Sequence, residues 1–193
     1  MKPEMDLVPT PSQTVGPYFA IELTTDEHCV RCVAGPQAQG ERVWITFRVL
    51  DGDGAPVDDA MVEIWQADAN GKYNHPDDLQ PKHLDAGWMG FGRIATGEDG
   101  SCVLETIKPG RVAHKTTQAP HLTLAVFARG MLKQLYTRVY FAGDPANDGD
   151  PILQLVPRDR RDTLMARPDP ARPGYWSFDI RLQGDKETVF FDV

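Results

Sequence analysis

Residues 42–67 read RVWITFRVLDGDGAPVDDAMVEIWQA, and this stretch decides the fold class. Its first part is rich in β-branched and aromatic residues that alternate in polarity with period two, as a half-buried β-strand requires. Asp51-Gly52-Asp53-Gly54 then supplies turn chemistry where a strand reverses, and a second strand-like run begins at Met61. The stretch predicts two strands joined by a hairpin turn rather than a calcium loop, because the later glutamate of such a loop is not at the required spacing.

Short segments of the same kind recur along the rest of the chain, separated by turns rich in glycine, aspartate, asparagine and proline. We expect further strands at residues 102–107, 122–127, 135–141, 175–182 and 188–193. Helix is expected only as a short turn at 152–156 and over 158–166, where Pro157 can open a helix and Pro168 ends it. The pattern predicts an all-β fold, a β-sandwich with long loops and little helix.

The length of 193 residues is typical of one domain, which we expect to span residues 1–193. Residues 1–41 read as an extended, proline-punctuated arm and interface segment, and residues 42–193 as the β-sandwich core with its loops. The stretch from Tyr73 to Phe91 is broken by proline and glycine, so it reads as one long loop with a functional or interface role.

The formal net charge of −8 and the isoelectric point near 5.0 argue against a nucleic-acid or anionic-membrane partner, because both surfaces repel an acidic protein. The apolar runs are too short to cross a bilayer. The start of the chain carries no apolar stretch of signal-peptide length. We therefore expect the protein to work in the cytoplasm.

The chain has three cysteines, Cys29, Cys32 and Cys102, which we interpret as thiols. The spacing of Cys29 and Cys32 also fits half a zinc site or a redox pair. Nothing else in the sequence completes a zinc set, and no βαβ pattern surrounds the pair, so the role of Cys29 and Cys32 stays open.

An ordered series of motifs covers nearly the whole chain: Thr10-Pro11-Ser12-Gln13-Thr14-Val15-Gly16-Pro17-Tyr18, Trp65 to Tyr73, Phe91-Gly92-Arg93, Lys108-Pro109-Gly110, Ala119-Pro120-His121 and Tyr136 to Phe141. This series resembles the intradiol ring-cleaving dioxygenases. The resemblance implies a β-sandwich and a non-haem ferric iron held by two tyrosines and two histidines. Phenolate and imidazole suit a hard ferric ion, whose charge displaces the tyrosine protons.

The family's ligand set is incomplete in this sequence. Arg111 follows the Lys-Pro-Gly turn where the family has a tyrosine, and Thr123 stands where the second histidine of a His-x-His pair belongs. The loop position of the other tyrosine falls near Leu79, and only His121 matches a ligand. We therefore predict no metal ligand and no catalytic residue in this chain, and interpret His121 as a structural, hydrogen-bonded residue.

These departures resemble the α chains of the family's heteromeric, protocatechuate-cleaving members. The resemblance implies a β-chain partner that holds Fe(3+), a site at the α/β interface, and assembly of αβ protomers into a larger oligomer. It carries over a substrate-binding set, namely Thr14, Gly16, Pro17, Tyr18 and Arg129. Glycine lets the backbone approach a flat ring, and the arginine fork suits a carboxylate.

The resemblance thus implies an iron-free α subunit that helps a β chain to cleave protocatechuate with O2 to 3-carboxy-cis,cis-muconate. Two alternatives remain open at this point. One is a self-sufficient intradiol dioxygenase for another catechol, and the other is a non-enzymatic β-sandwich that binds small molecules or partners.

Overall fold

A computed structural model describes residues 9–113 and 116–192 of the chain. The strands are β1 (Arg42–Leu50), β2 (Met61–Gln66), β3 (Phe91–Ala95), β4 (Ser101–Ile107), β5 (Val112–Ala113), β6 (Thr117–Gln118), β7 (His121–Phe127), β8 (Leu135–Phe141), β9 (Met165–Pro168) and β10 (Tyr175–Arg181). The helical turns are the π-helix η1 (Phe19–Leu23) and the 3-10 helices η2 (Pro145–Gly149), η3 (Leu153–Leu155) and η4 (Arg161–Leu164). Within these ranges, no helix has the length and apolarity needed to cross a bilayer.

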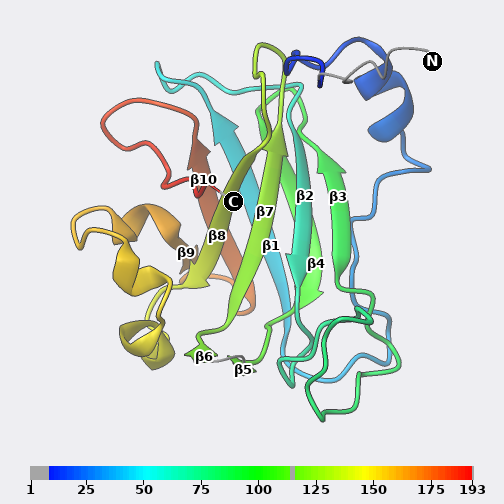
Figure 1. Ribbon diagram of the computed structural model, residues 1–193, viewed down its shortest axis with the longest axis vertical. Coiled ribbons are helices and arrows are strands. Elements are labelled where there is room, and N and C mark those ends of the chain that lie inside the picture. Colours follow the sequence, from blue (N-terminus) through cyan, green and yellow to red (C-terminus); the bar gives the residue numbers. More distant parts are fainter. Residues whose placement is uncertain (1–8, 114–115, 193) are drawn as a thin grey trace, which may run out of the picture.

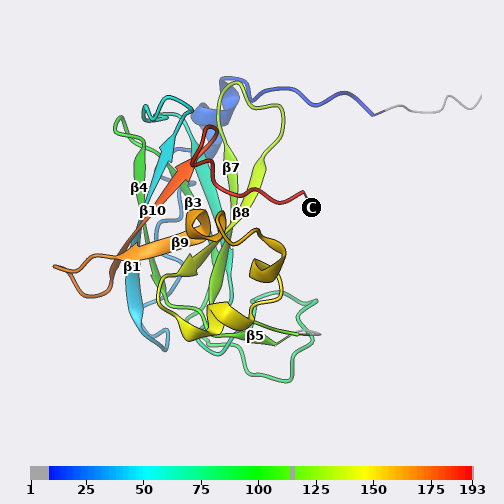
Figure 2. The same ribbon diagram turned by 90° about the vertical axis from the view of Figure 1, so that its left-hand side faces the viewer.

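The strands form two layers that share one short strand. The hydrogen-bonded order is β3-β2-β7-β8-β9-β10-β1-β4. Strand β9 pairs with β8 in parallel and with β10 in antiparallel orientation, so the sheet folds over at β9. The layer β3-β2-β7-β8 then faces the layer β10-β1-β4, as the two views in Figures 1 and 2 show. The predicted all-β sandwich with little helix is confirmed.

The alternation in the sequence explains the core between the layers. In β1, the side chains of Val43, Ile45, Phe47 and Val49 are all fully buried and point between the sheets. Burial of each such side chain contributes roughly 1.5–3 kcal/mol relative to its exposure. The strand pattern is therefore enforced by packing as well as by propensity.

The Asp51 turn forms as predicted but leads across the sandwich. The Asp51 carboxylate accepts hydrogen bonds from the backbone N–H groups of Asp53 and Ala55, both at 2.9 Å, and Leu50 forms a bridge with Pro56. The chain then crosses to β2, which lies in the opposite layer from β1. The expectation of a hairpin joining the two long strands is wrong. Strand β1 packs its apolar face against the layer that contains β2, and its hydrogen-bonded neighbours are β4 and β10.

Two other local expectations are corrected. The helix expected over 158–166 is limited to η4, and the segment from Met165 begins β9 because Ala166 is fully buried and its strand pairs with both layers. In the segment 188–192, a single bridge from Phe191 to Tyr136 replaces the expected strand, and Val193 lies outside the described residues. Strand β3 was not predicted, since Gly92 interrupts its pattern.

The N-terminal segment combines extended chain with one helical turn. Residues 19–23 coil into η1, although an extended arm was expected, because Phe19 donates its backbone N–H to Gly16 at 3.1 Å and Ile21 donates to Pro17 at 3.2 Å. Further along, Val33 and Ala34 are buried in the core. The described part of the segment therefore belongs partly to the sandwich, while residues 1–8 lie outside the described residues.

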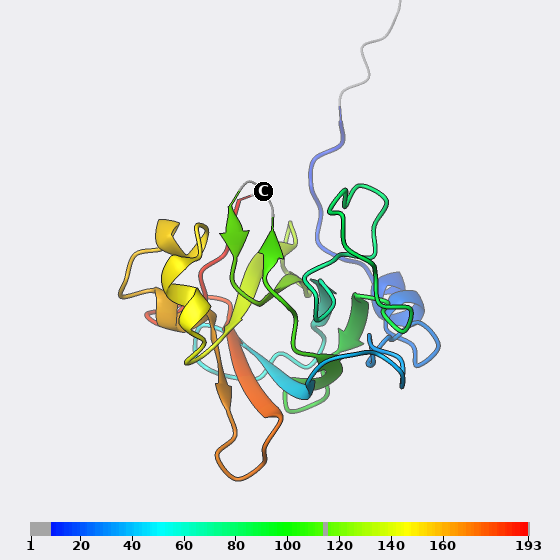
Figure 3. The same cartoon turned by 90° about the horizontal axis from the view of Figure 1, so that it is seen from below.

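The end of the sandwich opposite η1 holds β5, β6 and the long loop, and the 3-10 helices flank β8 and β9 (Figures 1 and 3). The buried Asp150 carboxylate connects these parts. It accepts hydrogen bonds from Ala119 N at 2.7 Å, Tyr140 Oη at 3.0 Å, Ile152 N at 2.9 Å and Leu153 N at 2.8 Å. These bonds fix the residues that lead into β7 and so place His121, its first residue.

Candidate functional site

His121 is buried with both ring nitrogens engaged. Its Nδ1 donates a hydrogen bond to the Ala119 carbonyl at 2.7 Å, and its Nε2 lies 3.5 Å from the Tyr73 hydroxyl. The side chain is only 1% exposed. Burial, reinforced by the positive charge of Arg138, lowers the pKa of His121 to about 4. The imidazole is therefore neutral at physiological pH and packed as an internal hydrogen-bonding group.

This arrangement does not fit the ferric centre that the family uses. The ring nitrogen of His121 that is not bonded to Ala119, Nε2, faces the hydroxyl of Tyr73, and burial raises the pKa of that phenol. The nearby guanidinium of Arg138 repels a cation. Arg111 and Leu79 are both exposed, and Thr123 carries a hydroxyl where the family has an imidazole. Across residues 9–113 and 116–192, no three His, Cys, Asp or Glu side chains group as a metal site.

The predicted substrate-binding residues come together at the other end of β7. The Gly130 backbone N–H donates a 2.8 Å hydrogen bond to the Thr14 hydroxyl, across 116 positions of sequence. The rings of Phe19 and Phe127 also meet, with centroids 6.1 Å apart. The N-terminal segment is thus fastened to the turn after β7 on both sides of Gly16.

Arg129 lies beside this bond on the same turn and is held by two carboxylates. Its guanidinium forms ion pairs with Asp58 at 3.6 Å and with Asp59, while the Arg129 side chain stays 76% exposed. Asp58 and Asp59 were not anticipated from the sequence, because they precede β2 and reach Arg129 only through the pairing of β2 with β7. Exposed pairs of this kind contribute little stability, so the guanidinium remains available to another anion.

The most exposed part of this surface consists of Gly16, Pro17 and Tyr18. Tyr18 is 80% exposed, and the space around Gly16 is open, with no atom within 4 Å of a built Cβ. The structure therefore places all five predicted residues in one region and brings Thr14 into contact with the Arg129 turn. Their role in substrate binding stays a prediction.

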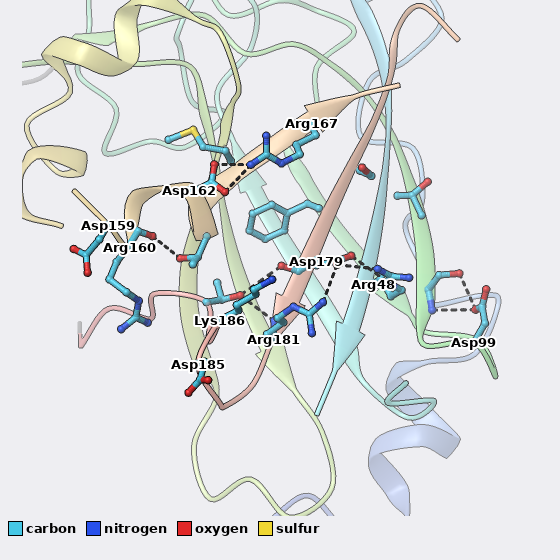
Figure 4. A pocket seen from close by; sticks show the side chains of 17 residues that line it. Arg48, Asp99, Asp159, Arg160, Asp162, Arg167, Asp179, Arg181, Asp185 and Lys186 are labelled. Atoms are coloured by element: carbon cyan, nitrogen blue, oxygen red, sulfur yellow. Dashed lines mark hydrogen bonds and ion pairs between the residues drawn. The ribbon is translucent and has the colours of Figure 1, made fainter. Parts of the chain in front are cut away.

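Another cavity lies elsewhere, on the outer face of β1, β9 and β10 (Figure 4). It measures about 810 Å³ and is lined by five acidic and five basic side chains, of which five are joined in ion pairs. Asp179 accepts two hydrogen bonds from Arg48, at 3.0 and 2.8 Å, and Asp162 binds Arg167 through both oxygens. Because acidic and basic side chains line this groove in equal number, it offers no excess charge of one sign to a charged ligand, and we do not regard it as the functional site.

The comparisons with known proteins agree with this geometry. A family model described as Dioxygenase matches residues 14–184. The protocatechuate 3,4-dioxygenase alpha chain of Burkholderia cepacia is 45% identical over 95% of this chain and 97% of its own length. The chain belongs to the intradiol dioxygenase family. The corresponding alpha chain of Pseudomonas putida is 41% identical over 97% of this chain and 98% of its own. The Burkholderia cepacia beta chain is 39% identical over 89% of this chain and 77% of its own.

Solved intradiol dioxygenase structures share the sandwich. The dioxygenase domain of a carbohydrate-binding fusion protein from Streptomyces sp. SirexAA-E superposes with a TM-score of 0.62 at 26% identity, covering 92% of this chain and 99% of that one. The 3-chlorocatechol 1,2-dioxygenase of Rhodococcus opacus 1CP superposes with a TM-score of 0.60 at 20% identity, covering 92% and 69%. The second likeness concerns the fold alone.

Sequence reasoning gave no role to a second group of residues, around Trp65, Tyr73 and Arg138. All three occur in quoted family motifs, but only strand pairing brings them together beside His121. The three cysteines are free, with Cys102 buried, Cys29 half-buried and Cys32 exposed. The role of Cys29 and Cys32 remains undecided.

Proposed function

We propose that this intradiol dioxygenase chain is the α subunit of a heteromeric protocatechuate 3,4-dioxygenase. In this proposal it completes the active site of an iron-bearing β chain, and the complex cleaves protocatechuate with O2 to 3-carboxy-cis,cis-muconate. The near full-length similarity to two alpha chains supports the subunit assignment.

One observation carries the proposal, namely the bond between Thr14 and Gly130. It joins the exposed Gly16-Pro17 backbone to the turn that bears Arg129, at a surface rather than in an enclosed cavity of this chain. Such a surface suits one wall of a pocket that a partner closes. There the backbone at Gly16 approaches the ring, and the planar guanidinium of Arg129 binds the carboxylate of protocatechuate through paired hydrogen bonds.

The iron is assigned to the β chain in this proposal. Support comes from His121, whose nitrogens are occupied by Ala119 and Tyr73, and from the cation at Arg138. When bound there, the iron supplies the activation of catechol and O2. The residues of this chain orient the substrate and exclude water from its carboxylate end.

The proposal includes assembly and location. Residues 1–193 act as one domain in which residues 1–41 supply arm and interface and residues 42–193 the core. The αβ protomers associate further into a higher oligomer. The acidic surface suits work in the cytoplasm without a nucleic-acid or membrane partner.

The test is replacement of Arg129 by alanine in the complex co-expressed with its β chain. Loss of a charge-assisted hydrogen-bonding fork predicts that KM for protocatechuate rises roughly tenfold, while iron content and assembly stay unchanged. The matched control is Arg167→Ala, since Arg167 also makes an exposed ion pair, with Asp162 at 2.5 Å, and lies outside residues 1–41. Unchanged kinetics in an intact Arg129→Ala complex would show that the assigned role is wrong.

Two further measurements separate the alternatives. Stoichiometric ferric iron and a tyrosinate visible band in this chain purified alone would establish a self-sufficient dioxygenase. No gain in protocatechuate-dependent oxygen uptake on adding the β chain would favour a binding module instead.

A further inference from the structure

Three side chains line up across adjacent strands at the end of the sandwich that holds β5 and β6. Trp65 on β2 is paired with Thr123 on β7, and Thr123 is paired with Arg138 on β8. Side chains in register across a sheet project from the same face, so an indole, a hydroxyl and a guanidinium share one row. Neighbouring strands are about 4.8 Å apart, which places the two ends of the row about 10 Å apart at the backbone.

The two ends of this row, Trp65 and Arg138, line a cavity of about 600 Å³. The loop after β2 and the strands β5 and β6 supply the other walls, through Tyr73, His75, Val112 and Gln118 among others. The Tyr73 ring is stacked on Trp65, with centroids 5.8 Å apart and planes at 11°, and His75 meets Trp65 edge-on at 6.2 Å. The cavity thus has an aromatic side and a cationic end.

The cationic end is Arg138, which is half-buried. Its guanidinium donates a 2.8 Å hydrogen bond to the neutral Gln118 side chain, and it makes no ion pair within the described residues. Its charge is felt at both neighbouring rings, since it opposes the rise in the pKa of Tyr73 and adds to the lowering of the pKa of His121. A half-buried guanidinium with a neutral partner favours an anionic ligand.

Two carboxylates also border the cavity, and neither neutralises this cation. Asp78 is occupied by Lys72, 3.3 Å away, and by the backbone N–H groups of Tyr73 and Gln80, at 2.7 and 3.0 Å. Burial alone would raise the pKa of Asp78, but these bonds outweigh it and lower the pKa. Asp77 is 92% exposed, so solvent screens its charge.

We propose that this cavity binds a small aromatic carboxylate, with the ring against Trp65 and Tyr73 and the carboxylate on Arg138. The ring faces select an aromatic body, and the planar fork selects a carboxylate over a neutral amide. Binding is non-covalent and needs no metal. The Arg129 surface lies just beyond the other end of β7, about 20 Å away by the length of that strand, so each of the two assignments can fail without the other.

The test uses the full chain and benzoate as the probe, with affinity measured by calorimetry. Arg138→Gln should weaken benzoate binding about tenfold or more, because it removes the charged fork while keeping a hydrogen-bonding side chain. Arg31→Gln makes the same change of charge on the surface and should leave the affinity within about twofold. Acetate and benzamide should each bind about tenfold more weakly than benzoate, since each lacks one of the two recognised parts.

A second variant locates the ligand even if Arg138→Gln fails to fold. Trp65→Phe keeps an aromatic wall but removes the indole beside the cavity. Benzoate should quench the tryptophan fluorescence of the parent chain and not that of Trp65→Phe, whose calorimetric affinity should stay within about threefold. Equal affinity in a folded Arg138→Gln chain, or quenching that survives in Trp65→Phe, would overturn the proposal. The Arg129→Ala complex tests the proposed function independently of both variants.

Discussion

Gly16→Ala separates a functional role of the N-terminal segment from a structural one. A Cβ built at Gly16 has no atom within 4 Å, and Gly16 is not in the left-handed region of φ. The new methyl therefore causes no clash within the chain. Because alanine has fewer unfolded conformations than glycine, the free energy of unfolding should rise by up to about 1 kcal/mol. If Gly16 lines the proposed pocket, the activity of the complex should instead fall, since the methyl lies where the substrate ring packs.

A displacement of the ring by about 1 Å can lower the rate by a factor of up to about one hundred, so we expect kcat/KM for protocatechuate to fall tenfold or more in the complex. The assay combines urea unfolding of the chain with oxygen uptake by the complex. The contrasting variant is Gly110→Ala, whose Cβ would lie 2.2 Å from the Ala69 carbonyl oxygen and so destabilise the fold itself. Wild-type kcat/KM in an assembled Gly16→Ala complex would refute the assignment of this backbone to the pocket.

Two further predictions concern the buried polar groups. Asp150→Asn replaces one acceptor oxygen of the carboxylate by an amide N–H donor, which then faces at least one of the four groups that donate hydrogen bonds to Asp150. The variant should therefore lower the free energy of unfolding by about 2–4 kcal/mol, whereas the exposed Asp53→Asn should change it by less than about 0.5 kcal/mol. Equal urea midpoints for the two variants would contradict this. The pKa of His121 is about 4 in the folded chain and about 6.5 when unfolded, so the unfolded state binds the proton first and stability falls as the pH drops through that window. His121→Gln should remove up to about 3 kcal/mol of this pH dependence, and parallel stability profiles from pH 7 to pH 4 would show that the imidazole does not titrate in this way.

Local patterns predicted most of the long strands but not how they pair. The runs around Val43 and Leu124 alternate strongly enough to fix a strand, because each buries one apolar face. By contrast, Met165–Pro168 has no such pattern, and it becomes β9 only because β8 and β10 offer hydrogen-bonding partners on both sides. The same tertiary pairing overrode the expected helix there.

The sequence by itself determined the all-β class, the family resemblance and the incomplete ligand set, since residue identity is enough for each. Only the tertiary structure brought Thr14 to Gly130 and placed Trp65 and Arg138 in one row. It also gave each ring nitrogen of His121 a partner, Ala119 and Tyr73. The physical reason is strand register, which depends on burying two sheets against each other and not on any local run of residues. Contacts between distant segments follow from that register, and they set which side chains face a common ligand.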